Sequence, residues 1–420
     1  MAARQRLQRT RDLSVSGRYR EAIEMADEGL SLLPPGSRGV ERERTRLDLL
    51  LERGHARVLM GDYAACSDFE AIQEQASEPL QQILARLGVA DCQSGTGEYE
   101  AAERHYRQAI EEAQNVGHDL GMIRGWRGLA SLYWKQGRID EAVQAVSQAR
   151  AILQRSPDVG ELGHTLLSLG IAQQLAGRLD QAITAYEEAL NCFRTLGDRH
   201  RVAAVLNNLG ELHQELRDLN RALQYHEEAV KVAIEVGAER MEIDIVRNIG
   251  VDLLLLGRYS EAMLALDKSL AQARQLGDKD HILQALYSLG DACLRQGDVE
   301  RAMQLTQELS AEAEAVKSEF HAARAKYLQG RAHLARGERG AAQAVLQDAL
   351  GEAHALPSRI LLWQLHAALG RASEDHNLAQ IHFRIAADFI QQTVEPLNDP
   401  EMRTRFLEQP EVRAVLERAR

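Results

Sequence analysis

The stretch from Glu161 to Asp198 reads ELGHTLLSLGIAQQLAGRLDQAITAYEEALNCFRTLGD, and the rest of the chain is built from copies of it. The pattern returns 40 residues later as VLNNLGELHQELRDLNRALQYHEEAVKVAIEVGA, residues 205–238. It returns again as VRNIGVDLLLLGRYSEAMLALDKSLAQARQLGD, residues 246–278. Self-similarity at a fixed period of this length indicates an array of stacked units, each packing on its neighbours.

A turn signal marks each copy: glycine, any residue, an apolar residue, two further residues and then alanine. It begins at Gly17, Gly61, Gly97, Gly137, Gly177, Gly257, Gly297 and Gly337. Arg217 takes the place of glycine in one copy, and from Gly97 to Gly337 every step is 40 residues. Because glycine tolerates the left-handed conformation that ends helices, each signal predicts a turn between two helices.

The copy at the centre of the chain shows the expected hairpin. Leu166, Leu169 and Ala172 recur at three-residue steps and predict a first helix over about 162–175. The second helix is predicted over about 179–196, where Ala182 and Tyr186 share one side. The sequence therefore predicts an all-α protein of about ten helical hairpins.

Small residues recur at two places in the hairpin. Alanine ends the turn signal in eight of nine copies, with Cys66 in the other, and we expect it to let the second helix approach the first closely. Glycine recurs in the first helix at Gly170, Gly210, Gly250, Gly290 and Gly330. Because glycine inside a helix costs about 1 kcal/mol relative to alanine, we expect it to admit the neighbouring unit.

These residues resemble the tetratricopeptide repeat, whose pattern is W-x2-L-G-x2-Y followed by A-x3-F. Trp126, Leu129 and Tyr133 follow it, with Ala142 later in the same copy. The period of 40 is longer than the usual 34 and is similar to that of kinesin light chains, polarity scaffolds and bacterial signalling regulators. The resemblance implies a right-handed α-solenoid superhelix whose first helices line the concave side.

The repeat boundaries divide the chain into an array over residues 1–395 and a tail over 396–420. We expect units near 3–36, 39–78, 79–118, 119–158, 159–198, 199–238, 239–278, 279–318, 319–357 and 358–395. The tail leaves the repeat pattern, and prolines predict short helices starting near Pro400 and Pro410. Met402, Phe406 and Leu407 are expected to cover the end of the array or to dock elsewhere.

Composition and motifs argue against several function classes. The net charge of −12 argues against bulk binding to nucleic acid or to an anionic membrane. The four cysteines are widely spaced, as expected for a reduced, cytoplasmic protein, and the arginine-rich composition is typical of bacteria. The sequence contains no phosphate-binding loop, zinc-protease motif or nucleophile elbow. We therefore predict no catalytic residue, no metal site and no cofactor.

The resemblance implies that the residue two before the glycine of the Leu-Gly pair faces the groove. This column reads Gly128, Ser168, Asn208, Asn248 and Ser288, and an asparagine amide offers the donor and the acceptor that a peptide backbone needs. The alternative is that these polar residues simply face water. Other residues expected on the groove are Arg127, Trp134, Lys135, Asn207, Glu211, Gln214, Arg247, Tyr287, Asp291, Arg295, Arg324, Tyr327 and Arg331.

Three functions remain open from the sequence. The first is a non-catalytic scaffold that binds a peptide or helical segment of a partner protein in the groove. The second is a sensor or regulatory module of a cyclase, kinase or transcription activator. The third is a structural protein that assembles with itself, forming a homo-oligomer through its terminal units or tail.

Overall fold

The computed structural model describes residues 1–15, 18–35, 39–353, 358–395 and 400–420. Within these ranges the chain is helical and contains no strand, which confirms the all-α prediction. The predicted turn at Gly17 lies outside the described residues. The helices are α1 (Ala2–Val15), α2 (Tyr19–Ser31), α3 (Val40–Leu59), the 3-10 helix η1 (Tyr63–Ala65), α4 (Cys66–Gln75), α5 (Pro79–Thr96), α6 (Tyr99–Asn115), α7 (Asp119–Lys135), α8 (Ile139–Leu153), α9 (Val159–Leu175), α10 (Leu179–Leu196), α11 (Arg199–Glu215), α12 (Leu219–Glu235), α13 (Glu239–Leu255), α14 (Tyr259–Leu276), α15 (Lys279–Gln296), α16 (Val299–Ala315), α17 (Glu319–Ala335), α18 (Arg339–Ala353), α19 (Arg359–Ala372), α20 (His376–Val394), α21 (Pro400–Leu407) and α22 (Pro410–Arg418).

The central hairpin forms where the sequence predicts it. Helix α10 has the predicted bounds, and α9 begins three residues earlier than predicted. The earlier start follows from a cap, because the Asp158 carboxylate accepts a hydrogen bond of 2.8 Å from the Glu161 backbone N–H. Gly177 has the left-handed conformation expected of it, with φ at +71°.

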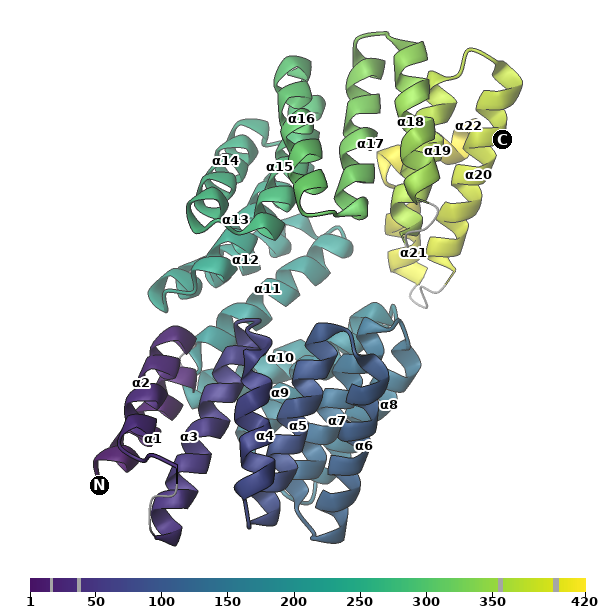
Figure 1. Ribbon diagram of the computed structural model, residues 1–420. Coiled ribbons are helices and arrows are strands. Elements are labelled where there is room, and N and C mark those ends of the chain that lie inside the picture. Colours follow the sequence, from purple (N-terminus) through teal and green to yellow (C-terminus); the bar gives the residue numbers. More distant parts are fainter. Residues whose placement is uncertain (16–17, 36–38, 354–357, 396–399) are drawn as a thin grey trace. The chain divides into compact units, whose positions relative to one another are not determined.

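Contacts between Cα atoms divide the chain into two compact units. Unit 1 comprises residues 1–205 and 232–238, and unit 2 comprises residues 206–231 and 239–420. Consecutive helices form hairpins in both units, as Figure 1 shows. The first helices also pack directly on one another, α5 on α7 and α9 in turn in unit 1, and α13, α15, α17 and α19 in turn in unit 2. The first helices therefore make up a continuous inner row in each unit.

The alanine column is buried in the hairpins on either side of the half-buried Cys66. Its members are fully buried: Ala22, Ala102, Ala142, Ala182, Ala222, Ala262, Ala302 and Ala342. Cys66 is half-buried in the same column. The predicted packing role of a small side chain at this place is confirmed.

The glycine column has a different neighbour from the one predicted. A Cβ at Gly170 would lie 2.4 Å from the Tyr186 ring, and one at Gly250 would lie 2.6 Å from Cγ of Leu266. Both large residues belong to the second helix of the same hairpin, so the expectation that glycine admits the neighbouring unit was wrong at these places. Gly290 is different: its closest neighbour is Leu328 of the following hairpin, at 2.9 Å.

The tail folds into the two predicted helices, α21 from Pro400 and α22 from Pro410. Helix α22 lies beside α20, as Figure 1 shows. Val412 and Val415 are buried in a cluster with Trp363 and Ile390, and Phe406 and Leu407 pack against that cluster. The tail therefore covers the last hairpin of unit 2. The Met402 side chain and residues 396–399 lie outside the described part.

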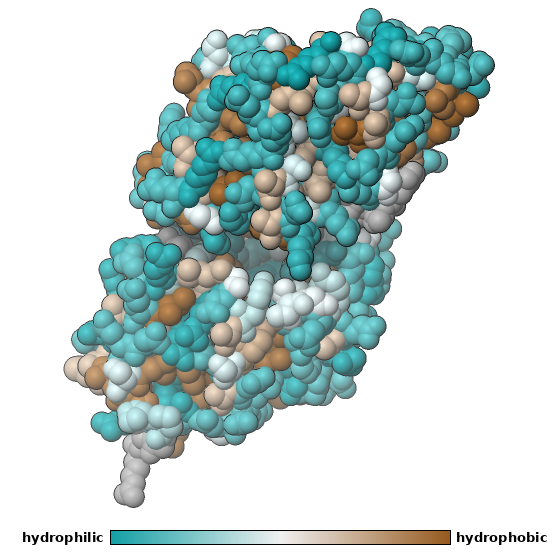
Figure 2. Space-filling view, turned by 45° about the horizontal axis from the view of Figure 1, so that its top comes forward, coloured by the Kyte–Doolittle hydropathy of each residue, from teal (hydrophilic) through white to brown (hydrophobic). Residues whose placement is uncertain are grey.

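The surface is mostly hydrophilic. On the face shown in Figure 2, hydrophobic residues form small scattered groups among hydrophilic ones. No helix in the described part of the chain has an apolar stretch long enough to cross a lipid bilayer.

Candidate functional site

The inner row of unit 2 carries most of the residues that the sequence analysis selected. We call the polar and charged side chains of α11, α13, α15 and α17 in this unit the first-helix surface. Its members are Asn207, Asn208, Glu211, Gln214, Arg247, Asn248, Tyr287, Ser288, Asp291, Arg295, Arg324 and Arg331. The contacts described next join one first helix to the following one, so adjacent repeats build this surface together.

Amide and carboxylate groups form a small network between α11 and α13. The Asn248 amide donates hydrogen bonds of 3.0 Å to both Asn207 Oδ1 and Glu211 Oε1. Asn207 donates to the same Glu211 oxygen at 2.9 Å. Asn248 is only 4% exposed. An approaching ligand would therefore meet Asn207 and Glu211, which are half-buried, before it reached Asn248.

The other members of the predicted asparagine and serine column differ in burial. Asn208 is half-buried on α11, whereas Ser288 is buried on α15. Ser168, on α9 of unit 1, is half-buried and donates its hydroxyl to the His164 carbonyl one turn earlier. Gly128 has a steric reason to lack a side chain, because a Cβ there would lie 2.2 Å from the Tyr106 ring. Of the column, Asn208 and Ser168 are the members open to solvent.

Arginines and tyrosines meet between α15 and α17. The Arg324 guanidinium stacks on the Tyr287 ring, with 3.4 Å between its Cζ and the ring centroid. Asp291 pairs with Arg295 at 2.8 Å and with Arg331 at 2.5 Å. Burial alone would raise the pKa of Asp291, but the charges of Arg331 and Arg295 outweigh it and hold the pKa below its usual value. One carboxylate thus orients two arginines on the first-helix surface.

Tyr327 differs from the expectation of a surface anchor. Its side chain is 5% exposed and belongs to the core cluster that contains Leu346 and Leu365. Burial raises its pKa to about 12. The residue spacing placed Tyr327 on the first helix correctly, but the following hairpin covers it. Tyr287, which is half-buried beneath Arg324, is the aromatic residue that this surface exposes.

A buried pair of a histidine and an aspartate lies under the same surface, and the sequence analysis did not find it. His226 Nδ1 lies 2.6 Å from Asp252 Oδ2, and both side chains are fully buried. Gln214 donates to the other Asp252 oxygen at 2.7 Å. A signal was present: His226 stands where Tyr186 and Leu266 stand in the two adjacent copies, and a Cβ at Gly210 would lie 2.4 Å from its ring.

The residues selected in unit 1 form a separate group. Arg124 and Arg127 of α7 both pair with Glu161 of α9, at 2.8 and 2.5 Å. Lys135 donates to the Ser94 hydroxyl at 3.3 Å, and the Trp134 side chain is 37% exposed. Glu161 thus pairs with two arginines of this group, and Trp134 is its exposed aromatic residue.

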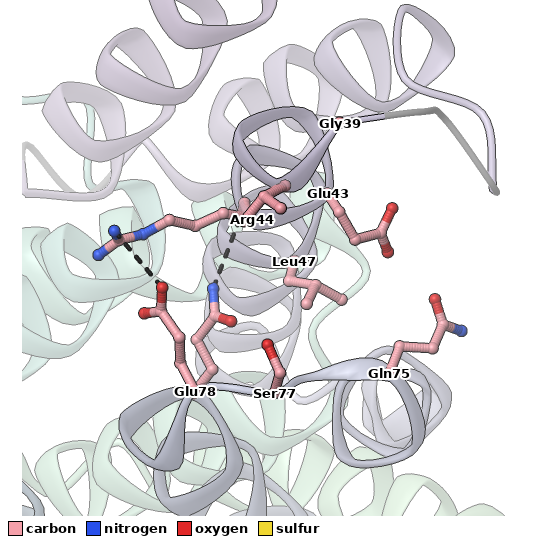
Figure 3. A pocket seen from close by; sticks show the side chains of 9 residues that line it. Gly39, Glu43, Arg44, Leu47, Gln75, Ser77 and Glu78 are labelled. Carbon is pink, nitrogen blue, oxygen red and sulfur yellow. Dashed lines mark hydrogen bonds and ion pairs between the residues drawn. The ribbon is translucent and has the colours of Figure 1, made fainter.

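Neither a metal site nor an enclosed catalytic cavity accompanies these residues. No group of three or more His, Cys, Asp or Glu side chains converges within the described ranges. A cavity of about 320 Å³ lies between α3 and α5 in unit 1, as Figure 3 shows. It is lined by Arg44 and Glu78, which pair at 3.4 Å, and contains none of the selected residues.

Comparison with solved structures supports the same fold. The apo form of RapI is 12% identical, with a TM-score of 0.65 over 83% of this chain and 98% of that chain. The apo form of the quorum sensor NprR from B. thuringiensis is 10% identical, with a TM-score of 0.57 over 83% and 98%. The Rap conjugation gene regulator of plasmid pLS20, in complex with the Phr* peptide, is 13% identical, with a TM-score of 0.55 over 84% and 98%. At these identities the likeness concerns the fold alone.

Comparison with family models is more specific. No curated protein matches the sequence. A model described as tetratricopeptide repeat matches residues 81–155, 121–195, 161–235 and 240–311, which together cover more than half of the chain. A second model with the same description matches residues 323–348. The chain belongs to the tetratricopeptide-repeat family.

Proposed function

We propose that this protein is a non-catalytic scaffold that binds a peptide or helical segment of a partner protein on its first-helix surface. Membership of a repeat family with an open inner row supports a binding role. Two of the similar structures are named as a quorum sensor and as a regulator in complex with a peptide, and they motivate a role in bacterial signalling in the cytoplasm. The net charge of −12 favours a protein ligand over nucleic acid.

The observation that carries the proposal is that the first helices of unit 2 present Asn207, Asn208 and Glu211 on α11 and arginines on α15 and α17. Amide side chains bind the backbone of a peptide through its N–H and C=O groups. Arginine guanidinium groups bind carboxylates with two parallel hydrogen bonds. A surface that offers both, built from rigid helices, suits a segment with polar backbone contacts and at least one acidic side chain.

A photo-crosslinking experiment tests this proposal. A photoreactive phenylalanine analogue replaces Asn208 on the inner row, and in a matched control it replaces Leu264, which is 72% exposed on the second helix α14. After irradiation in the source cells, we expect a discrete partner on the Asn208 protein that the Leu264 protein does not capture. Replacing Asn207 with alanine in the Asn208 protein should reduce that product at unchanged helicity. Identical products from both positions would contradict the proposal.

A further inference from the structure

The last two helices return to the first hairpin of unit 2 as well as covering the last one. Arg405 of α21 donates a hydrogen bond of 3.0 Å to the Leu216 carbonyl. Arg217 donates to the Gln409 side chain, just before α22, at 2.6 Å. These partners are about 190 residues apart in the chain, and all belong to unit 2. The tail therefore bridges the two ends of this unit.

Arg217 is the residue that breaks the turn signal. Glycine occupies the corresponding place at Gly177, Gly257 and Gly297, and each has a left-handed backbone. Arg217 has the same conformation, with φ at +59°, although it carries a side chain that disfavours it. The Arg217 side chain, which the left-handed turn disfavours, is also the side chain that binds the tail. The departure from glycine is thus explained by this contact and by nothing within the hairpin.

The tail presents a carboxylate to arginines from three different repeats. Glu411 pairs with Arg295 of α15 at 2.8 Å. Burial lowers the pKa of Arg217 and of Arg371 on α19, and the nearby charge of Glu411 acts in the opposite direction on both. Glu411 therefore lies among cations that the first helices and their turn provide. If Glu411 moved away, Arg295 would still be paired with Asp291.

Apolar residues beside Glu411 complete the contact. Val412 is fully buried and Val415 is 3% exposed, in the cluster formed by Trp363 and Ile390. They follow Glu411 by one and four positions. One side of α22 therefore carries both the carboxylate and the valines that pack on unit 2. The segment therefore brings a carboxylate to Arg295 of the first-helix surface while its valines pack on α19 and α20.

We propose that α21 and α22 form an intramolecular ligand that occupies the arginine side of the first-helix surface. The inference rests on the proposed function and deepens it. The partner segment that displaces the tail is an amphipathic helix with a key carboxylate and aliphatic residues one and four positions after it, as in Glu411, Val412 and Val415. Because the tail is tethered, its effective concentration is high, and it holds the site closed until such a partner is abundant.

A peptide of residues 400–420, labelled with a fluorophore, is the probe for this proposal. Its binding is measured by fluorescence anisotropy on the full chain and on two variants that weaken the native tail. One variant is Val412→Asp with Val415→Asp. The other is Glu411→Arg. It leaves the buried valines in place, so we expect the variant to fold normally. We expect both variants to bind the peptide at least tenfold more tightly than the unaltered chain.

Matched controls locate the site. Arg295→Gln, added to the chain with Val412→Asp and Val415→Asp, should abolish binding, and a peptide carrying Glu411→Gln should bind at least tenfold more weakly. Equal affinity for the unaltered and weakened chains, or no binding to either weakened chain, would show that the tail is a fixed cap and overturn the proposal.

Two further outcomes are decisive. Light scattering that finds dimers of the unaltered chain, dissociated by Glu411→Arg, would assign the site to the tail of a second copy and overturn the intramolecular assignment. Monomers at all concentrations support it. The peptide experiment uses this chain alone, so its failure leaves the photo-crosslinking of a partner at Asn208 unaffected. Conversely, absence of a partner at Asn208 would not alter tail exchange.

Discussion

The substitution Gly330→Ala tests the close packing of the two helices in a hairpin. Gly330 lies in the middle of α17, and a Cβ added there would lie 2.4 Å from Cγ and 2.5 Å from Cδ2 of Leu346 on α18. Leu346 is fully buried. Carbon atoms prefer a separation of about 3.5–4.0 Å, so Leu346 would have to move by roughly 1 Å or the helices would have to separate.

The magnitude follows from two opposing effects. Alanine has a higher intrinsic helix propensity than glycine by about 1 kcal/mol. Forcing an extra methyl group into a packed core costs about 1–3 kcal/mol, and the contact with Cγ rather than with a side-chain tip favours the upper part of that range. We therefore expect Gly330→Ala to lower the free energy of unfolding by about 1–2 kcal/mol.

The control is Gly351→Ala in α18 of the same hairpin. A Cβ at Gly351 would meet nothing within 4 Å, so this substitution should stabilise the protein by a few tenths to about 1 kcal/mol. Urea unfolding followed by circular dichroism measures both, and hydrogen exchange in α17 and α18 assigns the effect to the hairpin. The two variants should differ by about 1–3 kcal/mol.

A double mutant separates the steric clash from other effects. Leu346→Ala alone should cost about 2–5 kcal/mol, because it leaves a cavity. Combined with Gly330→Ala, it removes the clash and the new methyl partly fills the cavity, so we expect a favourable coupling of at least about 1 kcal/mol. Additive effects, or a Gly330→Ala protein as stable as the Gly351→Ala protein, would refute the close-packing argument.

Three further predictions concern single residues. Ala182→Leu should destabilise the protein by about 1–3 kcal/mol, because Ala182 is fully buried, and hydrogen exchange should accelerate first in α9 and α10. Asp375→Ala should lower the free energy of unfolding by about 0.5–2 kcal/mol, because the Asp375 carboxylate caps α20 by accepting hydrogen bonds from two backbone N–H groups. Asp375→Asn should have little effect, and thermal melts measure both variants. The hydrogen bond with Asp244 raises the pKa of His281 to about 9, against the effect of burial and with help from Asp278. The stabilisation that the protonated His281 gives the folded protein is therefore complete below pH 6.5 and is lost as the pH rises to about 9. The difference in free energy of unfolding between the unaltered protein and His281→Gln should shrink over that range. NMR titration of the imidazole should show the raised pKa.

The hairpin array could be predicted from the sequence because its signals are local. Gly177 ends a helix through its own backbone freedom, and Leu166, Leu169 and Ala172 share a face through helical geometry alone. The burial of Ala182 followed from its place in a repeating column. The prolines at 400 and 410 start the tail helices for an equally local reason.

The neighbours of each side chain depended on how the units stack. Gly170 contacts Tyr186 of its own hairpin, and no spacing along the chain distinguished this from a contact with the next unit. Tyr327 and Tyr287 occupy equivalent-looking places on first helices, yet the following hairpin buries Tyr327 and leaves Tyr287 half-buried. The buried pair of His226 and Asp252 likewise needed two helices to come together.

The sequence by itself determined that the chain is a helical-repeat protein, where its turns fall and which positions must be small, since periodicity and backbone preference act within one hairpin. Only the tertiary structure decided that the tail reaches Arg217 and Arg295, because that contact joins residues more than a hundred positions apart. It requires several packed hairpins to bring the two ends of unit 2 to the same tail, and no single repeat encodes that arrangement.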